Sequence, residues 1–161
     1  MKFIIALVLF VISTIVNSAT EVNSAYLVID ASVDGGESKP TWIALDGKDE
    51  ILHHPTGGKV AVLEPGLWTI AHVDFADKPT SRWGRRYLSG SLSLNLQGGK
   101  IYYLGTLQLQ SRVGHVNDFK IVTDASLLFT ACLEQPEIFE RFPLIVLHSF
   151  DKPERYVACK G

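Results

Sequence analysis

The clearest pattern of hydrophobic and polar positions lies in the segment GGKIYYLGTLQLQ, residues 98–110. After the two glycines the residues alternate between two sets: Ile101, Tyr103, Leu107 and Leu109, with Gly105 between them, and Tyr102, Leu104, Thr106, Gln108 and Gln110. Successive side chains of a strand leave opposite faces of the sheet, so each set is expected to share one face. One face on a core and one largely in water is typical of antiparallel sheets. The short turn at 97–100 also favours an antiparallel hairpin with the preceding strand.

Similar short segments, separated by turn residues, follow one another from position 25 onward. They predict strands at 25–33, 41–46, 50–54, 59–64, 67–75, 89–97, 115–124 and 143–150. Within 89–97, the side chains of Leu92, Leu94 and Leu96 are expected to point the same way. The predicted fold is therefore mainly β, an antiparallel β-sandwich.

The pattern changes at Asp124, which is placed as the N-cap of a helix in the segment DASLLFTACLEQ. The residues expected on one helical stripe are Leu127, Leu128, Ala131 and Cys132. Pro136 cannot continue this helix undisturbed, but it can open a new turn. We therefore expect one short helical segment at about 124–141 near the C-terminus.

The first 20 residues, MKFIIALVLFVISTIVNSAT, have the layout of a secretory signal, with one lysine, an apolar run, and small or polar residues. We expect a signal peptide at 1–19 and a single exported domain at 20–161, periplasmic or extracellular. The alternative is an uncleaved membrane anchor, for which the run is short, since a spanning helix needs about 20 apolar residues. The remaining chain has no further long apolar run, and therefore no expected transmembrane segment.

Charge and cysteine content narrow the class of protein. Without the lysine of the signal, 15 − 1 = 14 basic residues stand against 17 acidic ones, a net charge of −3. This balance argues against nucleic acid as a partner. The two cysteines, Cys132 and Cys159, predict a disulfide bond in an exported chain, and the alternative is two free, buried thiols.

One wider resemblance covers about residues 25–110. The sequence LEPG is followed by an aromatic strand LWTIAHV, and later by a leucine-alternating strand and GGKIYYLGTLQL. This order resembles small exported sandwich domains of the PEGA and transthyretin-like type, as in bacterial envelope protein families of unknown function. The resemblance implies an exported β-sandwich and supplies no catalytic residues. The lipoprotein cysteine common in such families is missing from the N-terminal segment.

The chain lacks the usual motifs of nucleophilic, nucleotide-dependent and zinc-protease chemistry. Its five histidines do not form a spaced metal motif. His53 and His54 are adjacent, so on a strand they point to opposite faces, and His72, His115 and His148 stand on separate strands. We therefore expect no metal site and no cofactor.

The basic segment DKPTSRWGRRY, residues 77–87, is the predicted ligand-binding loop. Its candidate residues are Lys78, Arg82, Trp83, Arg85, Arg86 and Tyr87. Arginine forks bind carboxylates and phosphates, and aromatic rings stack on sugars or guanidinium groups. The alternative is structural: Trp83 covers an open end of the core, and the arginines pair with Asp74 and Asp77.

These observations favour a non-enzymatic accessory or binding module of the cell envelope. Its expected partner is an anionic envelope component or another protein. A second hypothesis is a metal-dependent hydrolase using His72, His115 or His53. A third is a structural subunit of an envelope assembly that completes its sheet edges with a partner.

Overall fold

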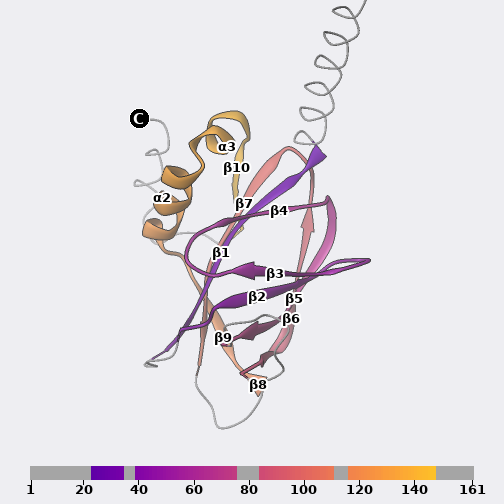
Figure 1. Cartoon of the computed structure of the whole chain (residues 1–161), viewed down its shortest axis with the longest axis vertical. Coiled ribbons are helices and arrows are strands. Elements are labelled where there is room, and N and C mark those ends of the chain that lie inside the picture. The colour runs from indigo at the N-terminus through magenta and orange to yellow at the C-terminus, as the bar shows by residue number, and fades with distance from the viewer. Residues whose placement is uncertain (1–22, 35–38, 76–83, 111–115, 148–161) are drawn as a thin grey trace, which may run out of the picture.

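The structure, a computed structural model, describes residues 23–34, 39–75, 84–110 and 116–147. These residues form two five-stranded sheets and two helices (Figure 1). The predicted signal peptide at 1–19 lies outside them. None of the helices in these ranges is both long and apolar enough to cross a membrane.

The first sheet has the strand order β10-β7-β1-β4; β10 pairs with the first half of β7, and β9 pairs with its second half. Its strands are β1 (Ala25–Val33), β4 (Val60–Leu63), β7 (Lys100–Leu109), β9 (Phe119–Val122) and β10 (Leu144–Val146). The second sheet has the order β3-β2-β5-β6-β8. Its strands are β2 (Trp42–Asp46), β3 (Ile51–Pro55), β5 (Gly66–Asp74), β6 (Arg86–Leu96) and β8 (Val116–Asn117).

The main hydrophobic core lies between the two sheets. Leu27 and Ile29 of the first sheet pack there with Ile43 and Ile70 of the second. A second cluster lies on the other face of the first sheet, where α2 (Ala125–Glu134) and α3 (Pro136–Arg141) cover it (Figure 1). The predicted mainly β, sandwich-like fold is confirmed, and its helical segment consists of two short helices.

The start of α2 is formed as predicted. The Asp124 side chain accepts a hydrogen bond from the Ser126 N–H at 2.8 Å, which satisfies one of the free donors of the first turn. The buried face of α2 consists of the predicted stripe, Leu127, Leu128, Ala131 and Cys132. Pro136 begins α3, as the sequence allowed. The partner predicted for Cys132, Cys159, lies outside the described residues.

The predicted β6–β7 hairpin is wrong. The turn after β6 carries the chain into the other sheet, and β7 pairs in parallel with β1 and β10. The Gly99 N–H donates to the Ser24 carbonyl at 2.8 Å, and a Cβ on Gly98 would lie 2.5 Å from the Asn23 carbonyl oxygen. This close contact with the residues before β1 directs the chain across the sandwich instead of back along β6.

The predicted faces of β7 are also wrong, because the strand contains an irregularity at Gly105. The pairing with β1 shifts by one residue there, and Gly105 has a φ of 102°. A Cβ at Gly105 would lie 2.6 Å from the Val122 carbonyl oxygen, so only glycine fits. Before this point Ile101 and Tyr103 face the helices, and after it Leu107 faces the main core. Both faces of the first half of β7 are buried, as expected of a strand with parallel neighbours.

The segment predicted as one strand at 115–124 is two short strands that belong to different sheets. β8 pairs with β6 in the second sheet, whereas β9 pairs with β7 in the first. Of the strand predicted at 143–150, the structure describes residues 143–147, and three of them form β10. β6 begins earlier than predicted, so Arg86 and Tyr87 belong to a strand and not to a loop.

Candidate metal centre

The site begins with an irregularity in β5. Trp68 and Ile70 point into the main core, so plain alternation would send His72 and Asp74 the same way. The pairing of β5 with β2 and β6 shifts between Ile70 and His72, which leaves Ala71 as the extra residue. Val73 then points into the core, and His72 and Asp74 leave the opposite, outer face of the sheet. An irregularity of this kind often re-aims side chains beside functional sites.

Cross-strand register brings His53 to the same place. Ala44 of β2 lies directly across from His53 of β3 on one side and from His72 of β5 on the other. The three residues therefore share one face of the sheet, with the smallest side chain in the middle. Ala44 is fully buried, and its methyl group leaves room above the strand for the two imidazole rings to approach each other.

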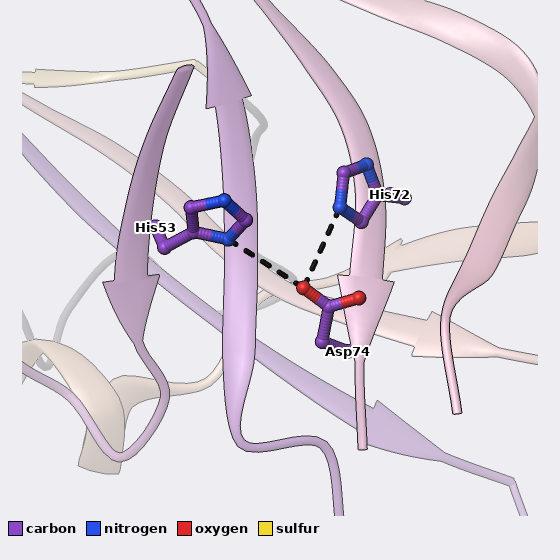
Figure 2. A group of neighbouring side chains, drawn as sticks. All are labelled: His53, His72 and Asp74. Carbon is purple, nitrogen blue, oxygen red and sulfur yellow. Dashed lines mark ion pairs between the residues drawn. The ribbon is translucent and has the colours of Figure 1, made fainter. Parts of the chain in front are cut away.

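Figure 2 shows the rings of His53 and His72 converging on the carboxylate of Asp74. The His53 Nδ1 atom lies 3.5 Å from Asp74 Oδ2, and the His72 Nε2 atom lies 3.4 Å from the same oxygen (Figure 2). These three atoms all lie within 4.8 Å of one another. We call His53, His72 and Asp74 the His–Asp cluster.

The converging atoms of the His–Asp cluster have no hydrogen-bond partner. Four buried side-chain nitrogen or oxygen atoms are unpartnered in the described part of the chain: His53 Nδ1, His72 Nε2, Asp74 Oδ2 and the indole Nε1 of Trp42. Three of them belong to the cluster, and the fourth belongs to Trp42, which lies on β2 directly across from Asp74. Buried polar atoms are rarely unpaired in folded proteins, so this concentration requires an explanation.

Burial shapes the electrostatics of the cluster. The Asp74 side chain is 0% exposed and that of His72 is 5% exposed, whereas that of His53 is 23% exposed. Burial lowers the pKa of His72, although the negative charge of Asp74 acts in the opposite direction. This favours the neutral imidazole, which is the form that binds metal ions.

Arg85 holds the other oxygen of Asp74. Its Nε lies 3.3 Å from Asp74 Oδ1, and a hydrogen bond between the Phe75 N–H and the Gly84 carbonyl (3.3 Å) joins the chain segments beside the pair. A hydrogen bond with Tyr87, followed by the pairing with Asp74, raises the pKa of Arg85. The pairing fixes one carboxylate oxygen and leaves Oδ2 directed at the two histidines.

The spacing of the cluster can be compared with a metal coordination sphere. With bonds of 2.0–2.1 Å, two tetrahedral ligands of a zinc ion are separated by about 3.3–3.4 Å. The two nitrogen–oxygen distances in the cluster, 3.5 and 3.4 Å, are close to that value. Two ligands of one ion can be at most about 4.2 Å apart, so a separation of up to 4.8 Å requires small movements of the two rings.

The residues predicted from sequence are only partly brought together. The loop was predicted to bind a ligand, and Arg85 and Tyr87 do lie beside the cluster, with the Tyr87 ring centroid 5.5 Å from that of His72. The alternative pairing with Asp74 also holds for Arg85. Arg86 lies across from Val73, on the opposite face of the strand from Tyr87. Lys78, Arg82, Trp83 and Asp77 lie outside the described residues.

The cluster unites two of the five histidines with an acid that sequence reasoning did not select as a ligand. His54 points away from it, and its Nε2–H donates to the Lys59 carbonyl at 3.0 Å. His115 and His148 lie outside the described residues. No sequence signal marked the shift at Ala71, and that shift is what places His72 and Asp74 beside His53.

A hollow with a volume of about 840 Å³ lies elsewhere in the molecule. It is formed by the turns after β2 and β4, and four acids line it: Asp46, Asp49, Glu50 and Glu64. Trp68 in its wall is satisfied, because its Nε1–H donates to the Glu64 carbonyl at 2.8 Å. None of the unpartnered buried atoms of the described chain lies in this hollow, so the His–Asp cluster is the better candidate site.

Comparison of the chain with protein-family models, with curated proteins and with solved structures found no match. The resemblance to PEGA-like and transthyretin-like domains therefore stays a prediction.

Proposed function

We propose that this protein is a metal-binding module, and that the His–Asp cluster binds one divalent transition-metal ion. The observation that carries the proposal is the convergence of three buried ligand atoms, His53 Nδ1, His72 Nε2 and Asp74 Oδ2, none of which has a hydrogen-bond partner. A metal ion would satisfy all three at once.

A hydrogen-bonded cluster without a metal is the competing explanation. Hydrogen bonds between a charged donor and a carboxylate are usually about 2.7–2.9 Å long. The ring nitrogens of His53 and His72 lie 3.5 and 3.4 Å from Asp74 Oδ2, so they form ion pairs with it that are longer than such bonds. An unpaired buried acceptor costs about 1–3 kcal/mol, so the metal-free arrangement is unfavourable. Both features favour a bound ion.

The ligand atoms point to the class of ion. Calcium and magnesium prefer oxygen ligands, whereas two imidazole nitrogens with one carboxylate oxygen suit zinc and its transition-metal neighbours. Zinc is therefore the ion that we propose first. Three protein ligands leave at least one coordination position open, which is the arrangement of exchangeable and catalytic sites and not of closed structural ones.

The contact between Arg85 and Asp74 supports the same proposal. A metal-binding carboxylate is commonly held in place by another hydrogen bond. Arg85 supplies this contact to Asp74 Oδ1 at 3.3 Å and leaves Oδ2 available. The positive charge of Arg85 repels a bound cation. We therefore propose that Arg85 positions the Asp74 carboxylate and does not itself attract the metal ion.

The proposed location is outside the cytoplasm, as the N-terminal segment predicts. The mature chain is expected to begin near Thr20. N-terminal sequencing of protein recovered from the culture medium or the periplasm tests this. Recovery of the intact N-terminus in a membrane fraction would contradict it without affecting the proposed metal site.

A metal-dependent hydrolase is the second candidate function. The open coordination position favours it, because a metal-bound water there would be activated as a nucleophile. Of the histidines proposed for such an enzyme, His53 and His72 belong to the cluster, together with Asp74. Release of nitrophenol from simple ester or phosphate-ester substrates, dependent on zinc and lost in His72→Gln, would favour the enzyme over the binding module.

Metal binding itself is tested with untagged, metal-free protein by equilibrium dialysis against zinc and by elemental analysis. We expect one ion per chain, and a loss of affinity of roughly 100-fold or more in His53→Gln, His72→Gln and Asp74→Asn. The matched control is His54→Gln, which removes the neighbouring imidazole on the other face of β3. Equal zinc binding by wild type and His53→Gln would refute the proposed site.

A further inference from the structure

We infer that the open position of the proposed metal site takes an oxyanion, a carboxylate or phosphate group, which Arg85 and the indole of Trp42 hold against the ion. This inference rests on the proposed metal binding. It connects the histidines of β3 and β5 with Arg85 of the basic segment 77–87, which the sequence analysis treated separately.

The first reason is charge. Metal-binding imidazoles are neutral, Asp74 contributes one negative charge, and Arg85 offsets it with one positive charge. A divalent ion would therefore leave about two uncompensated positive charges beside a fully buried carboxylate. Uncompensated charge at a buried position is unfavourable, so an anionic ligand at the open position would stabilise the loaded site.

The second reason is the unused donor capacity beside the cluster. The guanidinium group of Arg85 has five N–H donors, and Asp74 engages it through Nε. Its fork matches the oxygens of a carboxylate or phosphate group. The Arg85 side chain is 23% exposed, so a ligand that enters from solvent can reach it.

The third reason is the unpartnered indole of Trp42. Its Nε1–H is buried and has no acceptor in the described part of the chain. Trp42 lies directly across from Asp74 and two residues from Ala44 on β2, so its side chain leaves the same face as the cluster. An oxyanion on the ion offers an acceptor to this donor, just as the ion offers a partner to the three unpaired ligand atoms.

The site is open on the side of β6. Tyr87 is 47% exposed, and its ring lies beside that of His72. The Arg85 side chain, which precedes it, hydrogen-bonds to Tyr87. These two residues therefore form the rim through which an anion would pass from solvent to the ion. Water or hydroxide alone at the open position is the competing outcome, and the test below separates the two.

The test uses the cobalt(II)-loaded protein in a buffer that does not coordinate metals. The visible absorption of cobalt reports changes in its ligands. Inorganic phosphate and acetate are titrated separately, and we expect a saturable spectral change with at least one of them at millimolar concentration. The anion that binds more tightly identifies the chemical group of the natural ligand.

Two variants assign the anion contacts. Arg85→Gln should weaken anion binding by about tenfold or more. It is titrated as the cobalt-saturated protein, so that any loss of cobalt affinity from the missing contact with Asp74 is measured separately. Trp42→Phe should weaken anion binding without changing the cobalt stoichiometry. The matched control is Arg86→Gln, because Arg86 lies on the opposite face of the strand and its loss should leave anion binding unchanged.

The outcomes separate this inference from the proposed function. If cobalt does not bind, the proposed metal site and the oxyanion inference are both refuted. If cobalt binds but its spectrum does not respond to phosphate or acetate, the oxyanion inference is overturned and the metal site stands. An anion response that is unchanged in Arg85→Gln also overturns the inference, because the recognition would then not involve Arg85.

Discussion

The substitution Asp74→Asn should have opposite effects on stability with and without metal. It removes a buried negative charge and preserves the shape of the side chain. In the metal-free protein we expect the variant to be more stable than wild type, and in zinc we expect the order to reverse. A purely structural His–Asp cluster predicts the contrary result, a less stable variant under both conditions.

The magnitude for the metal-free protein follows from the contacts of Asp74. Its Oδ2 is buried without a hydrogen bond, which costs about 1–3 kcal/mol. An amide nitrogen in its place can donate to an imidazole nitrogen of His53 or His72. The contact with Arg85 is partly exposed, so weakening it costs at most about 1 kcal/mol. The expected net gain in the free energy of unfolding is about 1–2 kcal/mol.

The magnitude in zinc follows from mass action. Free zinc at 100 times its dissociation constant stabilises a one-site protein by about 2.7 kcal/mol. Wild type should gain this amount, whereas Asp74→Asn, which lacks the charged ligand, should gain little. The variant is then less stable than wild type by about 1 kcal/mol.

Urea unfolding followed by circular dichroism, in chelator and in buffered zinc, measures both differences. We expect the variant to have the higher free energy of unfolding in chelator and the lower one in zinc. A variant that is destabilised by more than about 1 kcal/mol in chelator would show that Asp74 has a structural role in the metal-free fold. Equal zinc stabilisation of both proteins would show that the ion binds elsewhere.

Three further predictions concern the surrounding fold. Burial lowers the pKa of His54, so the neutral ring is favoured in the folded state, and its contribution to stability should be complete above pH 6.5 and lost as the pH falls below it. His54→Gln should therefore flatten the fall in the free energy of unfolding between pH 7.5 and pH 5.5, and an unchanged slope would contradict this. Tyr103→Phe should cost about 2–3 kcal/mol, because the Tyr103 hydroxyl donates to the Asp124 carbonyl (2.6 Å) and accepts from the Asp124 N–H (2.9 Å); denaturant unfolding measures the loss, and a change below about 0.5 kcal/mol would refute it. A disulfide between Cys132 and Cys159 should stabilise the fold by roughly 3–4 kcal/mol, and thiol titration of unreduced, unfolded protein should find no free thiol, whereas two free thiols would disprove the bond.

Features set by local chemistry could be predicted from the sequence. The strand at 25–33 has the bounds of β1, because mostly apolar residues are followed by the sequence DGGE, which disfavours a strand. Asp124 caps α2, and Pro136 begins α3, because both positions depend on the backbone needs of the nearest few residues. The buried stripe of α2 follows from the helical repeat alone.

Features set by pairing between distant strands could not be predicted. The turn at 97–100 has the composition of a hairpin, yet its contact with the residues before β1 sends β7 into the other sheet. The shift in strand pairing at Gly105 has a signal in the sequence, since glycine inside a strand often marks an irregularity. The shift at Ala71 had none, because alanine fits a regular strand equally well.

The candidate site depends on the least predictable of these features. Regular alternation would have placed His72 and Asp74 in the core with Ile70, and His53 would then have had no partner across Ala44. The basic segment was recognisable from its composition, and Arg85 and Tyr87 do lie at the site. Their relation to the histidines appears only when β5 and β6 are paired.

The most direct test of the proposed metal site is anomalous diffraction at the zinc absorption edge, from crystals of the untagged protein grown with zinc. We predict one strong peak about 2.0–2.2 Å from each of His53 Nδ1, His72 Nε2 and Asp74 Oδ2. The absence of a peak between these atoms, with the side chains arranged as in the metal-free protein, would contradict the proposal.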